Sequence, residues 1–164
     1  MKLALKIFLM LFLTHGLAKS ASWYVSTFGG SDDWNGSEES PFSTIQKGID
    51  SAIDGDSVLV NDGTYYETLS LYKGILVKSI NGAENTIIDG SQTESNIVNI
   101  GHPSNWGSAV VFDGFTIQNQ AAYGIQNGNS WTDGYPLVTL KNLVFNDNST
   151  NIYWYSGYSG GLID

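Results

Sequence analysis

The sequence contains no cysteine and no arginine. The lack of cysteine excludes a disulfide framework, a thiolate zinc site and a cysteine nucleophile. The lack of arginine leaves 7 lysines against 16 acidic residues, for a formal net charge of −9. Phosphate groups are bound by clustered basic residues, so this charge argues against a nucleic-acid partner and against docking on anionic lipid.

Charged residues are few, at 14% of the chain, whereas apolar residues make up 41% and aromatic residues 13%. A chain this hydrophobic is not disordered, because it can bury enough apolar surface to fold. Its 164 residues are sufficient for one domain.

The N-terminus has the pattern of a secretory signal peptide. Lys2 and Lys6 accompany the apolar run 7–13, and small residues follow at Gly16, Ala18 and Ser20. The run is shorter than the roughly 20 residues that cross a bilayer. We therefore expect a signal peptide over 1–20 and a secreted or cell-surface protein with no membrane insertion after cleavage. The alternative is a buried N-terminal helix.

Cleavage near residue 20 changes the composition of the mature chain. It leaves 4 lysines and 16 acidic residues, a net charge of −12, and His102 as the only histidine. A two-histidine metal site or a histidine-rich active site is then excluded.

Residues 21–56 predict a strand, an acidic loop and one short helix. The run 23–26 is aromatic and β-branched, as in a strand, and four acids lie in the loop 28–40. A helix is expected to start at Ser43 as its N-cap and to end at 54–56. Its apolar residues recur at helical spacing, so one face must pack on the protein; these are Ile45, Ile49, Ala52 and Ile53.

Residues 57–164 predict short strands separated by Asn-Gly and Asp-Gly turns. The segments 109–119 and 137–147 match at an offset of 28, with apolar positions in register. Three further matches have offsets in the twenties: Ile87 with Val110, Ile75 with Ile97, and Ile125 with Ile152. This period is typical of a solenoid, in which stacked coils bury one continuous core. A leucine-rich repeat would need a regular leucine-asparagine frame, which is absent from this sequence. A sandwich of hairpins is the alternative, although hairpins would not explain the matched units.

Several segments resemble the N-terminal module and coil repeat of secreted right-handed parallel β-helix proteins with the pectate-lyase-like (pectin-lyase) fold. They are residues 23–26, 30–33, 41–50, 55–60, 62–67 and 113–119. The resemblance implies an all-β solenoid whose open N-terminal end is capped by the short helix. It also implies more coils than 57–164 can hold, so we expect an N-terminal portion of a longer protein, truncated within a coil.

The resemblance further implies polysaccharide β-elimination. That reaction needs a basic residue to remove a proton and a cation, usually Ca²⁺, to stabilise the resulting charge. The repeat alignment stacks Asp89, Asp113 and Lys141 at one corner of successive coils, so we expect Lys141 as the catalytic base beside a calcium site at Asp89 and Asp113. The alternative is that the Asp-Gly pairs only form the turns.

The acidic loop is the alternative calcium site, with Asp32, Asp33 and Glu38 as candidate ligands. The spacing does not match an EF-hand. The alternative is a solvated loop packed by its own tryptophan. The amides at Gln118 and Gln126 are expected to form inward hydrogen-bonded ladders.

Aromatic residues in two long insertions are candidates for substrate binding, because sugar rings stack on exposed aromatic side chains. They are Trp106, Trp131 and Tyr135. The alternative is that these rings cover their own loops.

We therefore expect a secreted β-helix protein that binds or acts on extracellular polysaccharide, as a Ca²⁺-dependent lyase in its full-length form rather than a glycoside hydrolase. The alternative is a non-catalytic surface, adhesion or scaffold module that contacts a cell-surface component.

Overall fold

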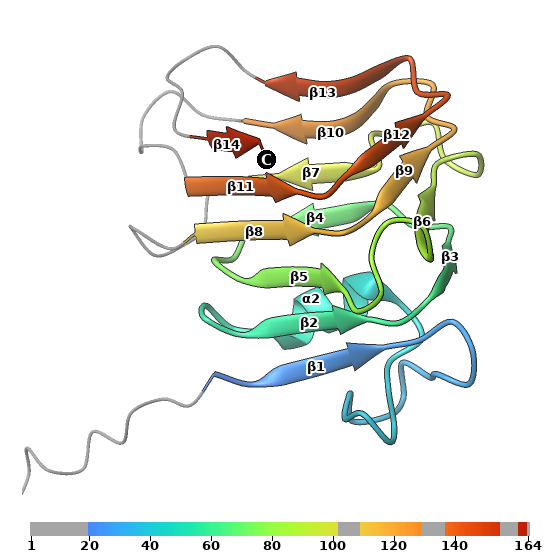
Figure 1. Ribbon diagram of the computed structural model, residues 1–164. Coiled ribbons are helices and arrows are strands. Elements are labelled where there is room, and N and C mark those ends of the chain that lie inside the picture. The colour runs from blue at the N-terminus through green and yellow to red at the C-terminus, as the bar shows by residue number, and fades with distance from the viewer. Residues whose placement is uncertain (1–19, 102–108, 129–136, 155–160, 164) are drawn as a thin grey trace, which may run out of the picture.

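Three parallel sheets wind around one axis and form a right-handed parallel β-helix (Figure 1). The computed structural model describes residues 20–101, 109–128, 137–154 and 161–163. Each coil passes through the three sheets in turn, and each strand pairs with the strand of the same sheet in the next coil. The predicted all-β solenoid with one short helix is confirmed.

The sheets are numbered here in the order in which a coil visits them. Sheet 1 contains β1 (Ser22–Val25), β2 (Ser57–Val60), β5 (Leu76–Ser79), β8 (Ala109–Asp113), β11 (Leu137–Lys141) and β14 (Gly161–Ile163). Sheet 2 contains β3 (Gly63–Tyr65), β6 (Thr86–Asp89), β9 (Thr116–Gln118) and β12 (Val144–Asn146). Sheet 3 contains β4 (Leu69–Leu71), β7 (Val98–Ile100), β10 (Tyr123–Asn127) and β13 (Thr150–Trp154).

The core is a column of aliphatic and aromatic side chains from the inner faces of the three sheets. In sheet 1, Val77, Phe112 and Leu140 lie in one fully buried row. The rings of Phe112 and Phe115 stack with their centroids 4.5 Å apart where the chain leaves sheet 1. Each such side chain contributes roughly 1.5–3 kcal/mol through burial, so the alternating pattern holds the coils in register.

The offset of 28 residues predicted the register of the later coils correctly. Val110 pairs with Val138 in sheet 1, and Ile117 pairs with Phe145 in sheet 2. The match of Ile125 with Ile152 in sheet 3 is confirmed as well.

Two matches at shorter offsets are wrong. Ile87 pairs with Thr116 in sheet 2, whereas its expected partner Val110 lies in sheet 1. Ile75 and Ile97 precede strands of different sheets, β5 and β7. The error at Ile87 has a physical cause: strands β6 and β8 both end in an Asp followed by Gly, so the same local sequence forms two different corners.

The helix α2 (Ile45–Ser51) covers the N-terminal end of the solenoid, as expected, and packs against β1, β2 and β4. Its N-cap is Thr44 rather than Ser43, because the Thr44 hydroxyl accepts the backbone N–H of Lys47. Ile53 lies beyond the helix and is 66% exposed, so its assignment to the apolar face was wrong.

Gln46 completes the hydrogen bonding of the outermost strand of sheet 3. Its Oε1 accepts the backbone N–H of Ser70 at 2.8 Å, and its Nε2 donates to the Ser70 carbonyl at 3.5 Å. The amide therefore occupies the place that a neighbouring strand would take beside β4. An edge paired in this way is no longer open to another chain.

Polar side chains from the first coils hold both ends of α2. The carboxylate of Glu67 accepts the backbone N–H groups of Ile45 and Gln46 at 2.9 and 3.0 Å. Burial of this carboxylate raises the pKa of Glu67 despite the two hydrogen bonds. At the other end, Lys73 Nζ donates to three carbonyl groups at 2.8–2.9 Å; these belong to Ile49, Asp50 and Ala52.

Replacement of Lys73 with Met should destabilise the protein, because three helix carbonyls lose their charged donor. We expect the free energy of unfolding to fall by roughly 1–3 kcal/mol. Urea denaturation followed by circular dichroism measures the change. Lys78→Met is the matched control, since Lys78 is exposed, and it should stay within about 0.5 kcal/mol of the wild type. Equal stability of K73M and the wild type would show that the cap does not depend on this lysine.

Candidate functional site

Asp89 is a buried carboxylate at the corner where β6 ends. It is 6% exposed and accepts hydrogen bonds from the Ser91 backbone, Gln118 Nε2 and Asn119 Nδ2, each at 2.8 Å. Burial alone would raise its pKa, but the three donors outweigh burial and lower the pKa of Asp89 to about 2. The carboxylate therefore stays ionised and ties two coils together.

The expected stacking of Asp89 on Asp113 is wrong. Asp89 pairs with Gln118 in sheet 2, whereas Asp113 lies in sheet 1 between Lys78 and Lys141. The structure thus brings together Asp113 and Lys141, as predicted, and adds Lys78 to the same row. The catalytic role of Lys141 and the calcium site at Asp89 and Asp113 stay predictions.

The acidic loop uses one of its three predicted calcium ligands for a structural contact. Asp32 accepts the backbone N–H groups of Ser43 and Thr44 and the Thr44 hydroxyl, at 2.8–3.0 Å. These hydrogen bonds outweigh the effect of burial and hold the pKa of Asp32 below its ordinary value. Asp33 and Glu38 are exposed. Within the described ranges, no three acidic or histidine side chains are grouped as metal ligands, and calcium binding by this loop stays a prediction.

The outer face of sheet 3 carries a row of polar and aromatic side chains in register. Ser70 pairs with Asn99, Asn99 with Gln126, and Gln126 with Tyr153. All four alternate with inward residues of the core, so they point to the outside of the solenoid. Gln126 was expected in an inward ladder and lies on the outer face instead.

Asn96 fixes the two central amides of this row. Its Nδ2 donates to Oδ1 of Asn99 at 3.0 Å and to Oε1 of Gln126. Its own Oδ1 accepts the backbone N–H of Tyr123 at 3.3 Å. Among the described residues, Asn99 Nδ2 and Gln126 Nε2 have no hydrogen-bond acceptor. Two oriented amide donors are therefore available to a ligand on this face.

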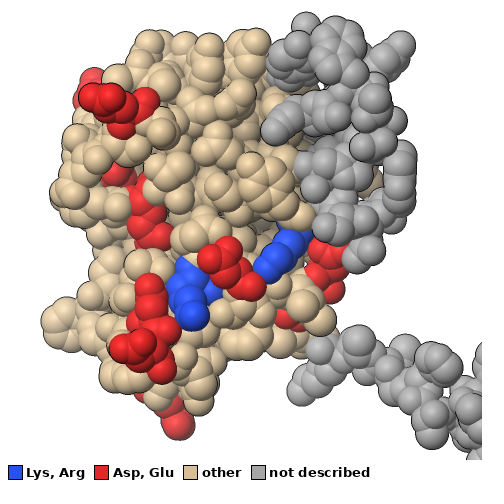
Figure 2. All heavy atoms as spheres, turned by 180° about the vertical axis from the view of Figure 1, so that it is seen from behind, with Lys and Arg blue, Asp and Glu red and all other residues tan. Residues whose placement is uncertain are grey.

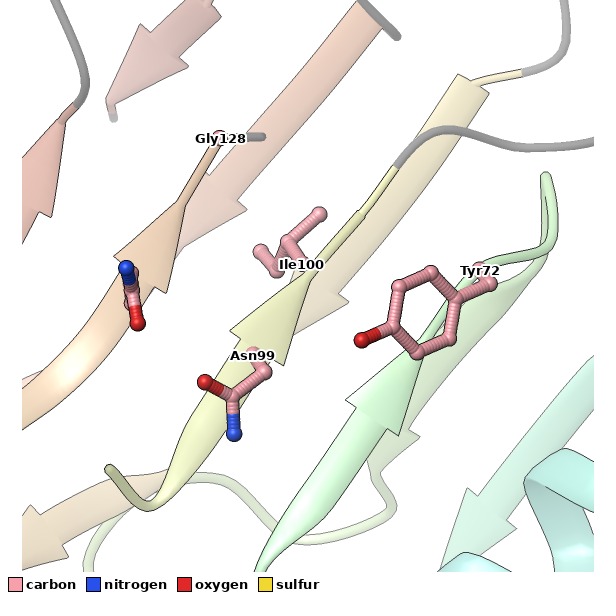
Figure 3. A pocket seen from close by; sticks show the side chains of 5 residues that line it. Tyr72, Asn99, Ile100 and Gly128 are labelled. Atoms are coloured by element: carbon pink, nitrogen blue, oxygen red, sulfur yellow. The ribbon is translucent and has the colours of Figure 1, made fainter. Parts of the chain in front are cut away.

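A small hollow of about 50 Å³ lies at one edge of the same face (Figure 3). It is lined by Tyr72, Asn99, Ile100, Gln126 and Gly128. Figure 3 shows the Tyr72 ring reaching from the end of β4 towards strand β7. Pockets that enclose small-molecule ligands have roughly 300–1,000 Å³, so the hollow does not enclose a whole sugar.

Aromatic rings border the row on both sides. Tyr72 is 47% exposed, and a Cβ added at Gly101 would collide with its ring, so the ring rests on the glycine backbone. Beside the row's other end, the rings of Tyr123 and Tyr153 stack with centroids 4.6 Å apart and an interplanar angle of 20°. Both positions offer flat apolar surfaces.

Figure 2 shows where charged side chains lie on this side of the molecule. In Figure 2, which views the molecule from the side of sheet 3, acidic and basic residues gather around the N-terminal end and along one edge. The four residues of the row and the flanking Tyr72 and Tyr123 are uncharged. The face therefore suits a neutral polar ligand.

The predicted substrate-binding residues Trp106, Trp131 and Tyr135 lie outside the described residues. The positions where their insertions begin are described. One follows β7 at Gly101 and the other follows β10 at Gly128, and the ends of β7 and β10 are adjacent in sheet 3. Both insertions thus start from the C-terminal ends of neighbouring strands on the same side of the solenoid, as predicted from the repeat.

Sequence reasoning missed the outward row itself. Asn99 lies between Val98 and Ile100, and this short alternation is the available signal for a strand with a polar outer face. Tyr72 directly follows a comparable alternation, 69–71. Neither pattern indicates which amides face one another, because that depends on the register between coils.

The stacked sheets and their helical cap define a parallel β-helix protein. The model of the family DUF1565, described as a protein of unknown function, matches residues 28–149, and the chain belongs to this family. No curated protein matches the chain, and no solved structure matches it. Among the described residues, no helix has the length and apolar character needed to cross a membrane.

Replacement of Asp89 with Asn should weaken the fold in a pH-dependent way. Both carboxylate oxygens accept hydrogen bonds, one from Ser91 and the other from Gln118 and Asn119, whereas an amide has a single acceptor oxygen and turns an N–H group towards a donor. We expect a loss of roughly 1–3 kcal/mol at neutral pH. The folded-state pKa lies below the ordinary value of 3.8, so the wild-type carboxylate stabilises the fold fully above about pH 4 and loses this effect as the pH falls through about 2.

The difference between the wild type and D89N should therefore shrink below about pH 4. Chemical denaturation at a series of pH values measures it. Asp113→Asn is the control: its Oδ1 accepts a hydrogen bond from Asn142 at 2.7 Å, which an amide oxygen can also accept. A pH-independent difference for D89N would contradict the assignment.

Proposed function

We propose that this chain is a secreted polysaccharide-binding module whose outer sheet-3 face binds a neutral glycan. The observation that carries the proposal is the register of Ser70, Asn99, Gln126 and Tyr153 on that face, with two amide N–H groups that have no acceptor among the described residues. The pattern of residues 1–20 supports export.

Sugars and this face have matching chemistry. A pyranose presents hydroxyl groups around its edge and an apolar surface of C–H groups on its faces. Asn99 and Gln126 can donate to the hydroxyl oxygens, while Tyr72 and Tyr153 can contact the apolar faces. Asn96 holds both amides in place before the ligand arrives, so little side-chain entropy is lost on binding.

The charge distribution favours a neutral glycan over a uronate. The row is uncharged, and the chain carries a net charge of −9, which repels polyanions. A polyanion would therefore need Ca²⁺ as a bridge, whereas a neutral chain needs none.

The double replacement Asn99→Leu and Gln126→Leu should weaken glycan binding, because it removes both donors while keeping side-chain size. Each hydrogen bond contributes roughly 0.5–1.5 kcal/mol, so we expect the affinity to fall about tenfold or more. The measurement is affinity electrophoresis and calorimetry of the secreted, processed protein against β- and α-glucans, mannan, galactan and polygalacturonate.

Thr139→Leu is the matched control, since Thr139 is an outward position in sheet 1 that pairs with Val111 of the adjacent strand. It should bind as the wild type does. Retention of no neutral glycan by the folded wild type would overturn the proposal and favour an adhesion or scaffold module.

A lyase is the second candidate, favoured by the row of Lys78, Asp113 and Lys141 on the outer face of sheet 1. Neighbouring strands lie about 4.8 Å apart, so one carboxylate lies between two lysines. On this proposal Lys141 removes the proton next to a uronate carboxylate, and a Ca²⁺ ion near Asp113 stabilises the developing charge.

On this proposal the wild type releases unsaturated uronate from polygalacturonate in the presence of Ca²⁺, and this product absorbs ultraviolet light. Replacement of Lys141 with Ala should abolish that absorbance. A chelator should have the same effect on the wild type. Lys47→Ala serves as the control, because Lys47 lies on α2 with its Nζ 5.8 Å from the centroid of the Phe42 ring. Turnover that survives K141A would exclude this lysine as the base.

A further inference from the structure

The outer face of sheet 3 is periodic along the solenoid axis. Strands β4, β7, β10 and β13 follow one another in the sheet, and each contributes one residue to the row. Because paired strands lie about 4.8 Å apart, the four side chains span about 14 Å. The spacing is set by backbone hydrogen bonds and is the same at each step.

The small hollow alone cannot account for glycan recognition. Its volume of about 50 Å³ is too small to enclose a whole sugar, so most of a sugar must lie over the surface of the sheet. Tyr72 borders the row near β4, and the stacked pair Tyr123 and Tyr153 borders it at β13. Flat apolar surfaces at both ends, with amides between them, suit a ligand that covers several strands.

We infer that this face binds an extended, β-1,4-linked neutral polysaccharide that runs across the strands, parallel to the solenoid axis, with one sugar unit on each coil. The inference rests on the function proposed above and specifies its ligand. An extended β-1,4-linked chain advances along its axis by close to one strand spacing per pyranose. Successive sugars would therefore meet Ser70, Asn99, Gln126 and Tyr153 in turn.

The linkage follows from the shape of the face. The four positions are in register in one continuous sheet, so the sites lie in an almost straight row. A β-1,4-linked chain is straight and can follow this row, whereas an α-1,4-linked chain curves away after a few units. The four residues of the row are uncharged, so the row fits glucose or mannose units better than a uronate chain.

The test measures affinity against chain length. Calorimetry with β-1,4-linked glucose oligomers, from one to six units, should show an affinity that rises roughly two- to tenfold with each unit up to four and then levels off. Oligomers of α-1,4-linked glucose of the same lengths are the control and should gain little beyond two units.

Single variants locate the subsites. Tyr153→Ala should shift the plateau from four units to three, because one end of the row is lost, while Tyr153→Phe should retain it. Thr139→Leu should leave the whole series unchanged, and circular dichroism confirms that each variant is folded.

The outcomes separate this inference from the proposed function. Retention of neutral glycans with an affinity that does not depend on oligomer length, or with equal preference for α- and β-linked series, would overturn the axial arrangement and leave glycan binding intact. Retention of no neutral glycan at all would overturn both. A rise that ends at four units would support both.

Discussion

The structure depends on parallel pairing of equivalent strands in successive coils. Every interior strand satisfies its backbone groups through the coil before and the coil after it, and the alternating apolar residues then form one continuous column. A shift of one residue between coils would turn the buried rows outward. The same pairing aligns Ser70, Asn99, Gln126 and Tyr153 on the outside, so the candidate binding face is a by-product of the register that builds the core.

The N-terminal end is where this pairing stops, and side chains take its place. Gln46 supplies an amide to the backbone of Ser70, the Glu67 carboxylate accepts the first N–H groups of α2, and Lys73 Nζ donates to carbonyl groups at the end of α2. The three contacts join the helix to the first coil, so polar side chains hold the cap on the solenoid.

Much of the fold was predictable because the repeat at an offset of 28 is regular, and it placed Val138 and Lys141 against their correct partners. Asp89 was misplaced because Asp-Gly occurs at two kinds of corner, and local sequence does not distinguish them. The outward amides could be identified as polar residues within strands. Their mutual contacts could not, because Asn96 and Gln126 are 30 residues apart and meet only through the register of two coils.

The insertions that contain Trp106 and Trp131 both begin where sheet 3 ends, and the corners between sheets 1 and 2 stay short at β8–β9 and β11–β12. One connection from sheet 1 to sheet 2 is longer: residues 80–85 join β5 to β6. Strand β6 still pairs in register with β3 and β9, so a longer connection leaves the stacked strands in order. The connections between strands can therefore differ in length from coil to coil while the scaffold of paired strands is kept.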